Sequence, residues 1–92
     1  MTSKKAIHAY FEGMVQGVGF RFTARDIAQR YSLGGWIKNC SDGRVELIAC
    51  GDEHKIQAFL DELYGTFQRH ITDQTIEPCQ PPADCKGFAI RF

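Results

Sequence analysis

A glycine-rich segment of the chain is typical of loops that bind small anions. It reads Gly13-Met14-Val15-Gln16-Gly17-Val18-Gly19-Phe20-Arg21 and lies between a strand-like and a helix-like pattern. The first N–H groups of a helix have no partners inside the helix, and they lie at the positive end of its dipole. Glycines let the preceding loop approach a ligand closely, and Arg21 would add a planar fork of donors suited to two phosphate oxygens. The segment therefore suggests a phosphate-binding loop.

Taken alone, the same segment has a simpler interpretation. Glycines between a strand and a helix often form a tight connection, and a single first-turn arginine is usually solvated. The segment also differs from two widespread phosphate loops, since no glycine is followed by Lys-Ser or Lys-Thr and no Gly-x-Gly-x-x-Gly occurs within it. On its glycines alone, a plain connection is the better interpretation.

A second segment reverses this balance. Gly35-Trp36-Ile37-Lys38-Asn39 is followed by Gly43-x-Val45 and Gly51. By itself, Asn39 would be interpreted as a turn former ahead of Ser41-Asp42-Gly43. Together, however, the two segments resemble the two signatures of the acylphosphatase family, in the family's order and at its spacing. The likeness covers most of the chain and is weakest from residue 66 to 87.

The resemblance implies hydrolysis of the carboxyl–phosphate bond of a small-molecule acyl phosphate to a carboxylate and inorganic phosphate. It implies that Arg21 and Asn39 are the catalytic residues, with Asn39 positioning the attacking water. No metal ion or other cofactor is expected. The phosphate-binding residues implied by the family are those of one loop: Val15, Gln16, Gly17, Val18, Gly19, Phe20 and Arg21.

The implied chemistry agrees with the properties of these residue types. An acyl phosphate has a good leaving group, so positioning and charge stabilisation by N–H donors and a guanidinium supply most of the catalysis. The Asn39 amide carries both a donor and an acceptor, so it can orient a water but cannot deprotonate it. Our hypothesis is that a phosphate oxygen of the substrate takes the proton.

The periodicity of apolar residues predicts which elements hold the two segments. Alternation predicts strands, and helical spacing of apolar residues predicts two helices. We expect Asp52 to cap the start of the second helix and Gly65 to cap its end. In chain order the expected elements are a strand at residues 7–12, a helix at 20–31, a strand at 35–40, a strand at 44–50, a helix after Asp52, an edge strand at 71–78 and a strand at 88–92.

This order favours an α+β fold of the ferredoxin-like type, an α/β sandwich with βαββαβ order and a short C-terminal strand. Such a fold is an antiparallel sheet with two helices on one face. A length of 92 residues suits one domain, which we assign to residues 1–92. We expect Phe20, Phe22 and Trp36 in the core or in the wall of a pocket.

The composition of the chain limits the classes of binding partner that are expected. The formal net charge is zero, from 11 basic and 11 acidic residues, which argues against duplex nucleic acid or an anionic membrane as a partner. No apolar run is long enough to span a membrane, and Met1–Lys5 with its alternating continuation does not resemble a signal peptide. We therefore expect a cytoplasmic protein. Its oligomeric state stays open, with a monomer as the default.

The remaining reactive side chains show no pattern of a catalytic or metal site. Cys40, Cys50, Cys79 and Cys85 contain no C-x-x-C pair, so four free thiols are the default for a cytoplasmic chain. A disulfide between Cys79 and Cys85 is the alternative. The histidines at 8, 54 and 70 are scattered and expected at the surface. Asp42 and Glu46 are close in sequence, but acyl phosphate hydrolysis needs no carboxylate pair.

Two other classes of function remain as alternatives. The first is an RNA-binding module, because Gly19-Phe20-Arg21-Phe22 superficially resembles an RNA-recognition motif. That motif requires its stacking aromatic residues on a central strand, whereas here they fall at a loop-to-helix junction. The second is a regulatory or scaffold domain that binds a small anion without turnover, like the accessory acylphosphatase-like domain of larger carbamoyl-transferring proteins.

Overall fold

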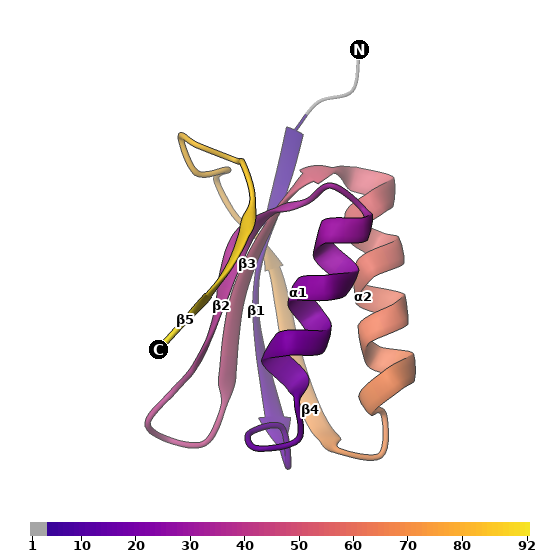
Figure 1. Cartoon of the computed structure of the whole chain (residues 1–92), viewed down its shortest axis with the longest axis vertical. Coiled ribbons are helices and arrows are strands. Elements are labelled where there is room, and N and C mark those ends of the chain that lie inside the picture. Colours follow the sequence, from indigo (N-terminus) through magenta and orange to yellow (C-terminus); the bar gives the residue numbers. More distant parts are fainter. Residues whose placement is uncertain (1–3) are drawn as a thin grey trace.

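The alternating segments of the sequence form one five-stranded sheet, and both helices lie side by side on the same face of it (Figure 1). The computed structural model describes residues 4–92. Residues 1–3, part of the stretch compared with a signal peptide, lie outside the described residues. The elements in chain order are β1 (Lys4–Gly13), α1 (Phe20–Arg30), β2 (Gly34–Asn39), β3 (Val45–Asp52), α2 (Glu53–Phe67), β4 (Ile71–Pro78) and β5 (Phe88–Arg91).

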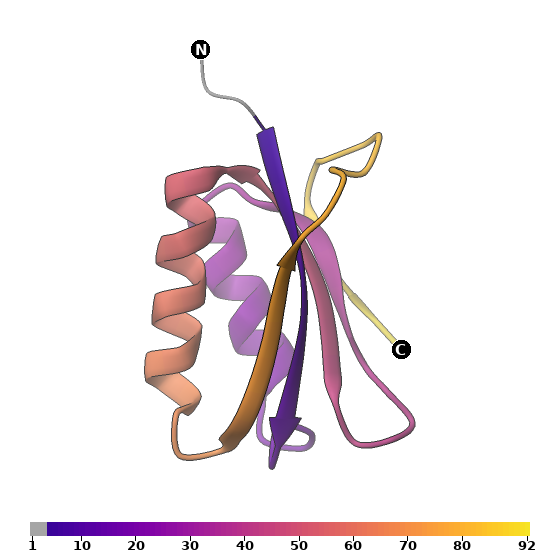
Figure 2. The same cartoon turned by 180° about the vertical axis from the view of Figure 1, so that it is seen from behind.

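The strand order across the sheet is β4-β1-β3-β2-β5. The first four strands pair antiparallel, as expected for a ferredoxin-like sandwich. The expectation of a wholly antiparallel sheet is wrong at one edge, because β5 pairs parallel to β2, with Trp36 opposite Ala89. The segment between β4 and β5 crosses from one edge of the sheet to the other (Figure 2). The chain links β5 to β4 and not to its sheet neighbour β2, so no hairpin fixes the direction of the β2–β5 pair, and the crossover delivers β5 parallel to β2.

The core lies between the sheet and the two helices. Alternate residues of the strands point toward the helices, and one stripe of each helix points back, as the sequence periodicities require. Among residues 4–92, no polar or charged residue is buried. The largest fully buried side chains of the core are Phe11, Phe20, Phe59, Ile37, Leu47, Leu63, Val15 and Val45.

The second helix begins as predicted but ends later. The Asp52 carboxylate accepts hydrogen bonds from the N–H groups of His54 and Lys55, at 2.9 and 3.2 Å, so the predicted N-cap is confirmed. Gly65 does not cap the helix, which continues to Phe67. The reason is tertiary: the Phe67 ring is buried 4.7 Å from that of Phe20, and burial of a phenylalanine outweighs the cost of one helical glycine.

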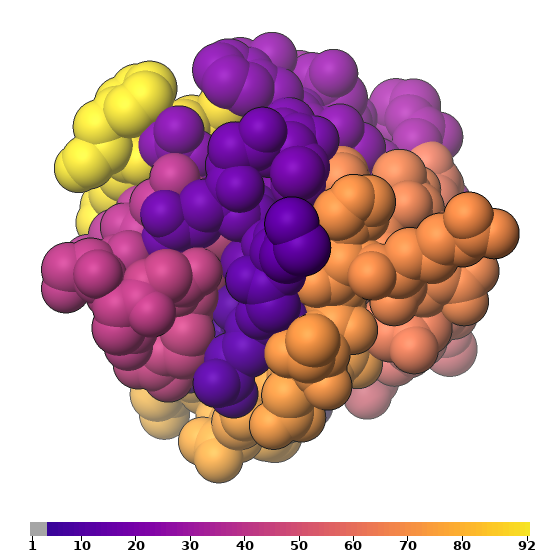
Figure 3. Space-filling model, turned by 90° about the horizontal axis from the view of Figure 1, so that it is seen from below, coloured from indigo at the N-terminus to yellow at the C-terminus, as the bar shows by residue number. Residues whose placement is uncertain are grey.

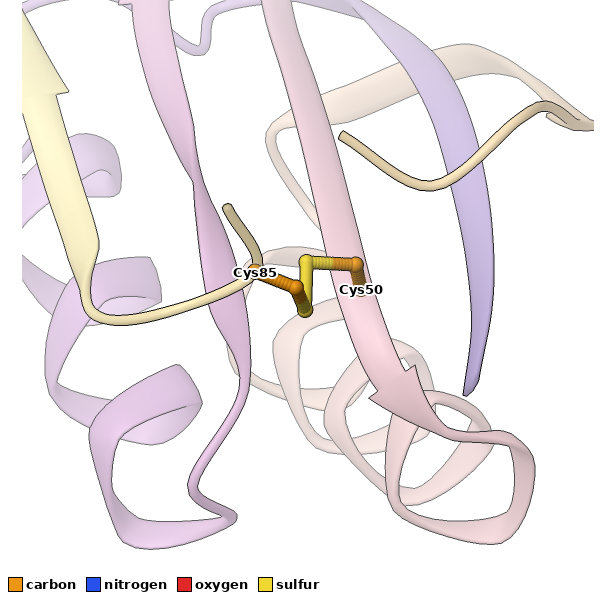
Figure 4. Close-up of a disulfide and its surroundings, with 2 residues drawn as sticks. All are labelled: Cys50 and Cys85. Atoms are coloured by element: carbon orange, nitrogen blue, oxygen red, sulfur yellow. A yellow bond between two sulfur atoms is a disulfide. The ribbon is translucent and has the colours of Figure 1, made fainter. Parts of the chain in front are cut away.

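A disulfide joins Cys50 of β3 to Cys85 in the crossing segment (Figure 4). The default of four free thiols is therefore wrong, and so is the alternative pairing of Cys79 with Cys85. Cys40 and Cys79 are free. Cys50 lies on the face of β3 opposite to the core-facing Ala49, and the crossing segment brings Cys85 to that face. Only the path of the crossover, which local sequence does not specify, makes these two cysteines neighbours.

None of the helices in residues 4–92 combines the length and apolar character needed to cross a membrane.

Removal of this disulfide should destabilise the fold. The two cysteines are 35 residues apart in sequence, and closing a loop of that size in the unfolded chain is worth about 3–4 kcal/mol. We expect Cys85→Ser to lower the free energy of unfolding by about that amount in urea titrations under oxidising conditions. Cys79→Ser is the matched control, because Cys79 is free. Equal stability of wild type and Cys85→Ser would contradict the expectation.

Candidate active site

The glycine-rich segment forms the loop between β1 and α1, at the same end of the molecule as the β2–β3 turn (Figure 1). Two buried side chains hold its ends. Val15 and Phe20 are each 1% exposed, and the Phe20 ring packs 5.3 Å from that of Phe11. Between them, Gly17, Val18 and Gly19 are exposed. Apolar side chains therefore anchor the loop, while its middle leaves the backbone accessible to a ligand.

The glycines give this loop a conformation that other residues adopt with strain. Gly17 and Gly19 both have a φ of 80°, in the left-handed region, and Gly19 is the N-cap of α1. No side chain caps α1, and no acidic residue lies in its first turn. Asp52 and Glu53, in contrast, occupy the start of α2. The N-terminus of α1 thus keeps its positive end free for an anion, whereas that of α2 is already satisfied.

Arg21 projects from the first turn of α1 toward the C-terminal residues. Its Nη1 donates a hydrogen bond to the carbonyl oxygen of Arg91, at 3.2 Å. Its guanidinium carbon lies 4.8 Å from the centroid of the Phe92 ring. These two contacts come from the last residues of the chain and orient the guanidinium. Sequence reasoning did not find them, since no local pattern connects positions 70 residues apart.

Asn39, the last residue of β2, contributes an unpaired acceptor. Its Oδ1 atom is buried and has no hydrogen-bond donor among the described residues. A buried carbonyl oxygen without a donor costs about 1–3 kcal/mol, so such an atom is suited to accept a hydrogen bond from a ligand or a water. The amide thus has the property that a water-orienting group needs.

These parts meet at a hollow of about 110 Å³. Figure 3 views this end of the molecule, with the β2–β3 turn and the C-terminal residues on one side of the loop segment and the start of β4 on the other. Of the predicted site residues, Gln16 and Val18 do not line the hollow. Phe22, expected in a core or a pocket wall, lines it while half exposed. The lining residues are Val15, Gly17, Gly19, Phe20, Arg21, Phe22 and Asn39.

A larger hollow, of about 620 Å³, lies between α2 and the start of β1 and end of β4, with Lys4, Ile56 and Pro78 among its lining residues. It does not include the loop, Arg21 or Asn39. Size alone does not identify a site for a small anion, and the N-terminus of the adjacent helix is already capped by Asp52. The smaller hollow is therefore the candidate site for a small anion. No cluster of three His, Cys, Asp or Glu residues able to hold a metal ion occurs within residues 4–92.

The remaining candidates lie away from this hollow. Asp42 is engaged by Arg44, whose backbone N–H and side chain lower the pKa of the Asp42 carboxyl. Burial and the nearby Glu46 carboxylate raise the pKa of the Cys40 thiol, which makes it a poor nucleophile. Glu46 itself accepts a hydrogen bond from Tyr10, at 3.0 Å. Tyr10, Cys40 and Glu46 form a polar cluster on the sheet face opposite to the helices, whereas Asp42 lies in the exposed β2–β3 turn.

Within that cluster, His8 Nε2 lies 2.7 Å from the Glu46 carboxylate, and Lys38 Nζ lies 3.7 Å away. Burial raises the pKa of the Glu46 carboxyl, but the hydrogen bonds from His8 and Tyr10 outweigh it, so the pKa lies below its ordinary value. A lowered pKa in the folded state stabilises the protein at pH above the ordinary value, and that stabilisation is lost as the pH falls through the folded pKa.

Glu46→Gln should therefore lower the free energy of unfolding at neutral pH. The stability of this variant should also fall less than that of the wild type as the pH is lowered. We expect the gap in unfolding free energy between wild type and Glu46→Gln to shrink as the pH falls below about 4. Urea titrations at several pH values measure it. Glu77→Gln, an exposed position on β4, is the control. A gap that stays constant from pH 6 to about pH 3 would count against the role of Glu46.

Comparison with known proteins identifies the family. The family model for acylphosphatase matches residues 7–90. The chain belongs to the acylphosphatase family, the hydrolases of acyl phosphates. It is 42% identical to an acylphosphatase of Pseudomonas aeruginosa over 86 residues, which cover 92% of this chain and 93% of that protein. The crystal structure of acylphosphatase from Bacillus subtilis superposes with a TM-score of 0.85 at 30% identity, covering 96% of this chain and 99% of that one.

The same fold also occurs as a small part of a longer protein. Full-length HypF in its phosphate- and nucleotide-bound form matches with a TM-score of 0.82 at 25% identity, and the match covers all of this chain but 12% of HypF. The acylphosphatase-like fold therefore occurs both as a chain of about this length and as a small part of a much longer chain.

Proposed function

We propose that this chain hydrolyses the carboxyl–phosphate bond of small acyl phosphates, with phosphate held by the Val15–Arg21 loop and by Arg21, and with water oriented by Asn39. One observation carries the proposal. The uncapped start of α1, Arg21 and Asn39, whose Oδ1 atom is buried, all line one small hollow. An anion-binding element and a neutral water-binding group on one hollow are what this reaction requires.

The loop and Arg21 would supply electrostatic stabilisation. N–H groups at the free helix start and the guanidinium would donate hydrogen bonds to the phosphate oxygens, where charge is spread in the transition state. The loop is held in advance by buried Val15 and Phe20, and the guanidinium contacts the Arg91 carbonyl and the Phe92 ring. Fixed donors need little reorganisation during the reaction, which favours the transition state over free substrate.

Asn39 would place the water that attacks phosphorus. Its Oδ1 accepts a hydrogen bond from that water and holds it near the bound phosphate. The amide cannot remove a proton, so we propose that an oxygen of the substrate's phosphoryl group accepts it. The P–O bond to the acyl group breaks, the carboxylate leaves without needing an acid, and inorganic phosphate remains in the loop.

We further propose that residues 1–92 form one domain, that the protein acts as a monomer without nucleic acid or membrane partners, and that it is cytoplasmic. Disulfides persist mainly in oxidising compartments, so a cytoplasmic location implies a reducing environment for Cys50 and Cys85. Cell fractionation combined with thiol trapping tests this location. Recovery of the protein outside the cytoplasm with both cysteines oxidised would overturn it.

The two alternatives predict different outcomes. An RNA-binding surface needs exposed aromatic rings on a strand, whereas Phe20 is buried at the start of a helix. A domain that binds anions without turnover would bind phosphate but release none from acyl phosphates. Phosphate release from acetyl phosphate or benzoyl phosphate by the wild type, measured with EDTA present, separates turnover from binding.

Arg21→Ala should lose both phosphate binding and turnover. Removal of one such donor typically costs about 100- to 1,000-fold in rate. We expect a loss of that size in kcat/KM for benzoyl phosphate and a weaker inhibition constant for inorganic phosphate. Arg25→Ala, one turn along the same helix, is the matched control and should keep its activity. Full activity of Arg21→Ala would overturn the site assignment while leaving the proposed reaction in place.

Asn39→Ala should lose turnover while phosphate affinity is largely kept. Misplacing the attacking water costs on the order of 100-fold in kcat, whereas the donors to phosphate stay in place. The measurement pairs kcat with the inhibition constant for phosphate. A variant that binds phosphate weakly but turns over at the wild-type rate would contradict the water-orienting role.

A further inference from the structure

The Gln16 side chain lies between the phosphate loop and the β2–β3 turn. Its Nε2 group donates one hydrogen bond to the carbonyl oxygen of Cys40, at 2.8 Å, and one to that of Arg44, at 3.0 Å. Its two partners are 24 and 28 residues away in sequence. The side chain is half-buried and does not line the hollow. Its amide is therefore engaged by the turn and not available to a phosphate in the hollow.

The two acceptors belong to the residue pair that closes the turn. The N–H of Cys40 donates to the carbonyl of Arg44, at 2.7 Å, and the N–H of Gly43 donates to the carbonyl of Cys40, at 3.2 Å. Cys40 follows Asn39 directly in the chain. A bond to the carbonyl of Cys40 is thus one residue from the group proposed to orient water, and the Gln16 amide acts on the backbone that carries Asn39.

Within residues 4–92, the two Gln16 bonds are the side-chain hydrogen bonds that connect residues 14–19 with residues 39–44. The loop has two glycines with positive φ on the C-terminal side of Gln16, and Met14 before it is exposed. Val15 ties the loop to the core beneath it. The Gln16 side chain instead connects the loop to the β2–β3 turn through its two hydrogen bonds. Val15 and Gln16 therefore restrain the loop in different directions.

We propose that the Gln16 side chain is a positioning residue that sets the placement of the phosphate loop relative to Asn39. The inference rests on the proposed roles of the loop and of Asn39. If the two halves of the site are misaligned, the loop and Arg21 still bind phosphate, but the water held by Asn39 no longer lies in line with phosphorus. Reaction rate is far more sensitive to such misplacement than binding is.

The test is a kinetic comparison of Gln16→Met with wild type. Methionine keeps the length of the side chain and removes both donors. We expect kcat for benzoyl phosphate to fall about tenfold, with the inhibition constant for phosphate changed by less than about threefold. Gln29→Met, at an exposed site on α1, is the matched control and should match wild type. An unchanged kcat, or a loss confined to phosphate affinity, would overturn the proposal.

A double-mutant cycle with Asn39→Ala separates positioning from a general loss of stability. If Gln16 acts through Asn39, Gln16→Met should lower kcat little further in the Asn39→Ala background. Losses that multiply would overturn the proposal. Failure of the proposed function is distinguishable, because the wild type would then release no phosphate from benzoyl phosphate. Failure of the water-orienting role alone would leave Asn39→Ala with wild-type turnover. Should Gln16→Met fold poorly in urea titrations, Gln16→Asn, whose shorter amide cannot span both carbonyls, is tested with the same criteria.

Discussion

Phe20 enters the core as the first residue of α1, with its ring against Phe11 of β1 and Phe67 of α2. This burial determines where the helix begins and therefore where its free N–H groups point. Gly19 precedes it in the left-handed conformation, and Arg21 follows it on the first turn. An aromatic residue held by two other elements cannot shift without opening the core, so the uncapped start of α1 is held by the packing of the core.

The two helices show how small differences at the N-terminus lead to different uses. The start of α2 is capped by the Asp52 side chain and carries Glu53, so its positive end is neutralised within the chain. The start of α1 has glycine in place of a capping side chain and no acidic residue in its first turn. A missing cap costs stability, and at α1 the same feature leaves donors free for a ligand. We interpret the start of α1 as an end that lacks the stabilisation of a capping side chain but keeps its N–H donors available to an anion.

The C-terminal strand adds a part that the βαββαβ core does not supply. β5 lies at the edge of the sheet beside β2, and the residues at its end contact the Arg21 guanidinium. Phe88 anchors the strand in the core, and the Cys50–Cys85 disulfide anchors the segment before it. The contacts of the Arg21 guanidinium, which we propose binds phosphate, thus depend on a crossover that begins at the far edge of the sheet.

Local sequence determined the identity and order of the strands and helices, the Asp52 cap and the two motifs by which the chain resembles its family, because these follow from short-range periodicity, turn chemistry and residue spacing. Tertiary structure decided the parallel pairing of β5, the continuation of α2 past Gly65, the Cys50–Cys85 bond and the partners of Gln16 and Arg21. Each of these joins residues distant in sequence. Their energies arise from packing and hydrogen bonding between elements, and a local pattern contains no information about which distant surfaces meet.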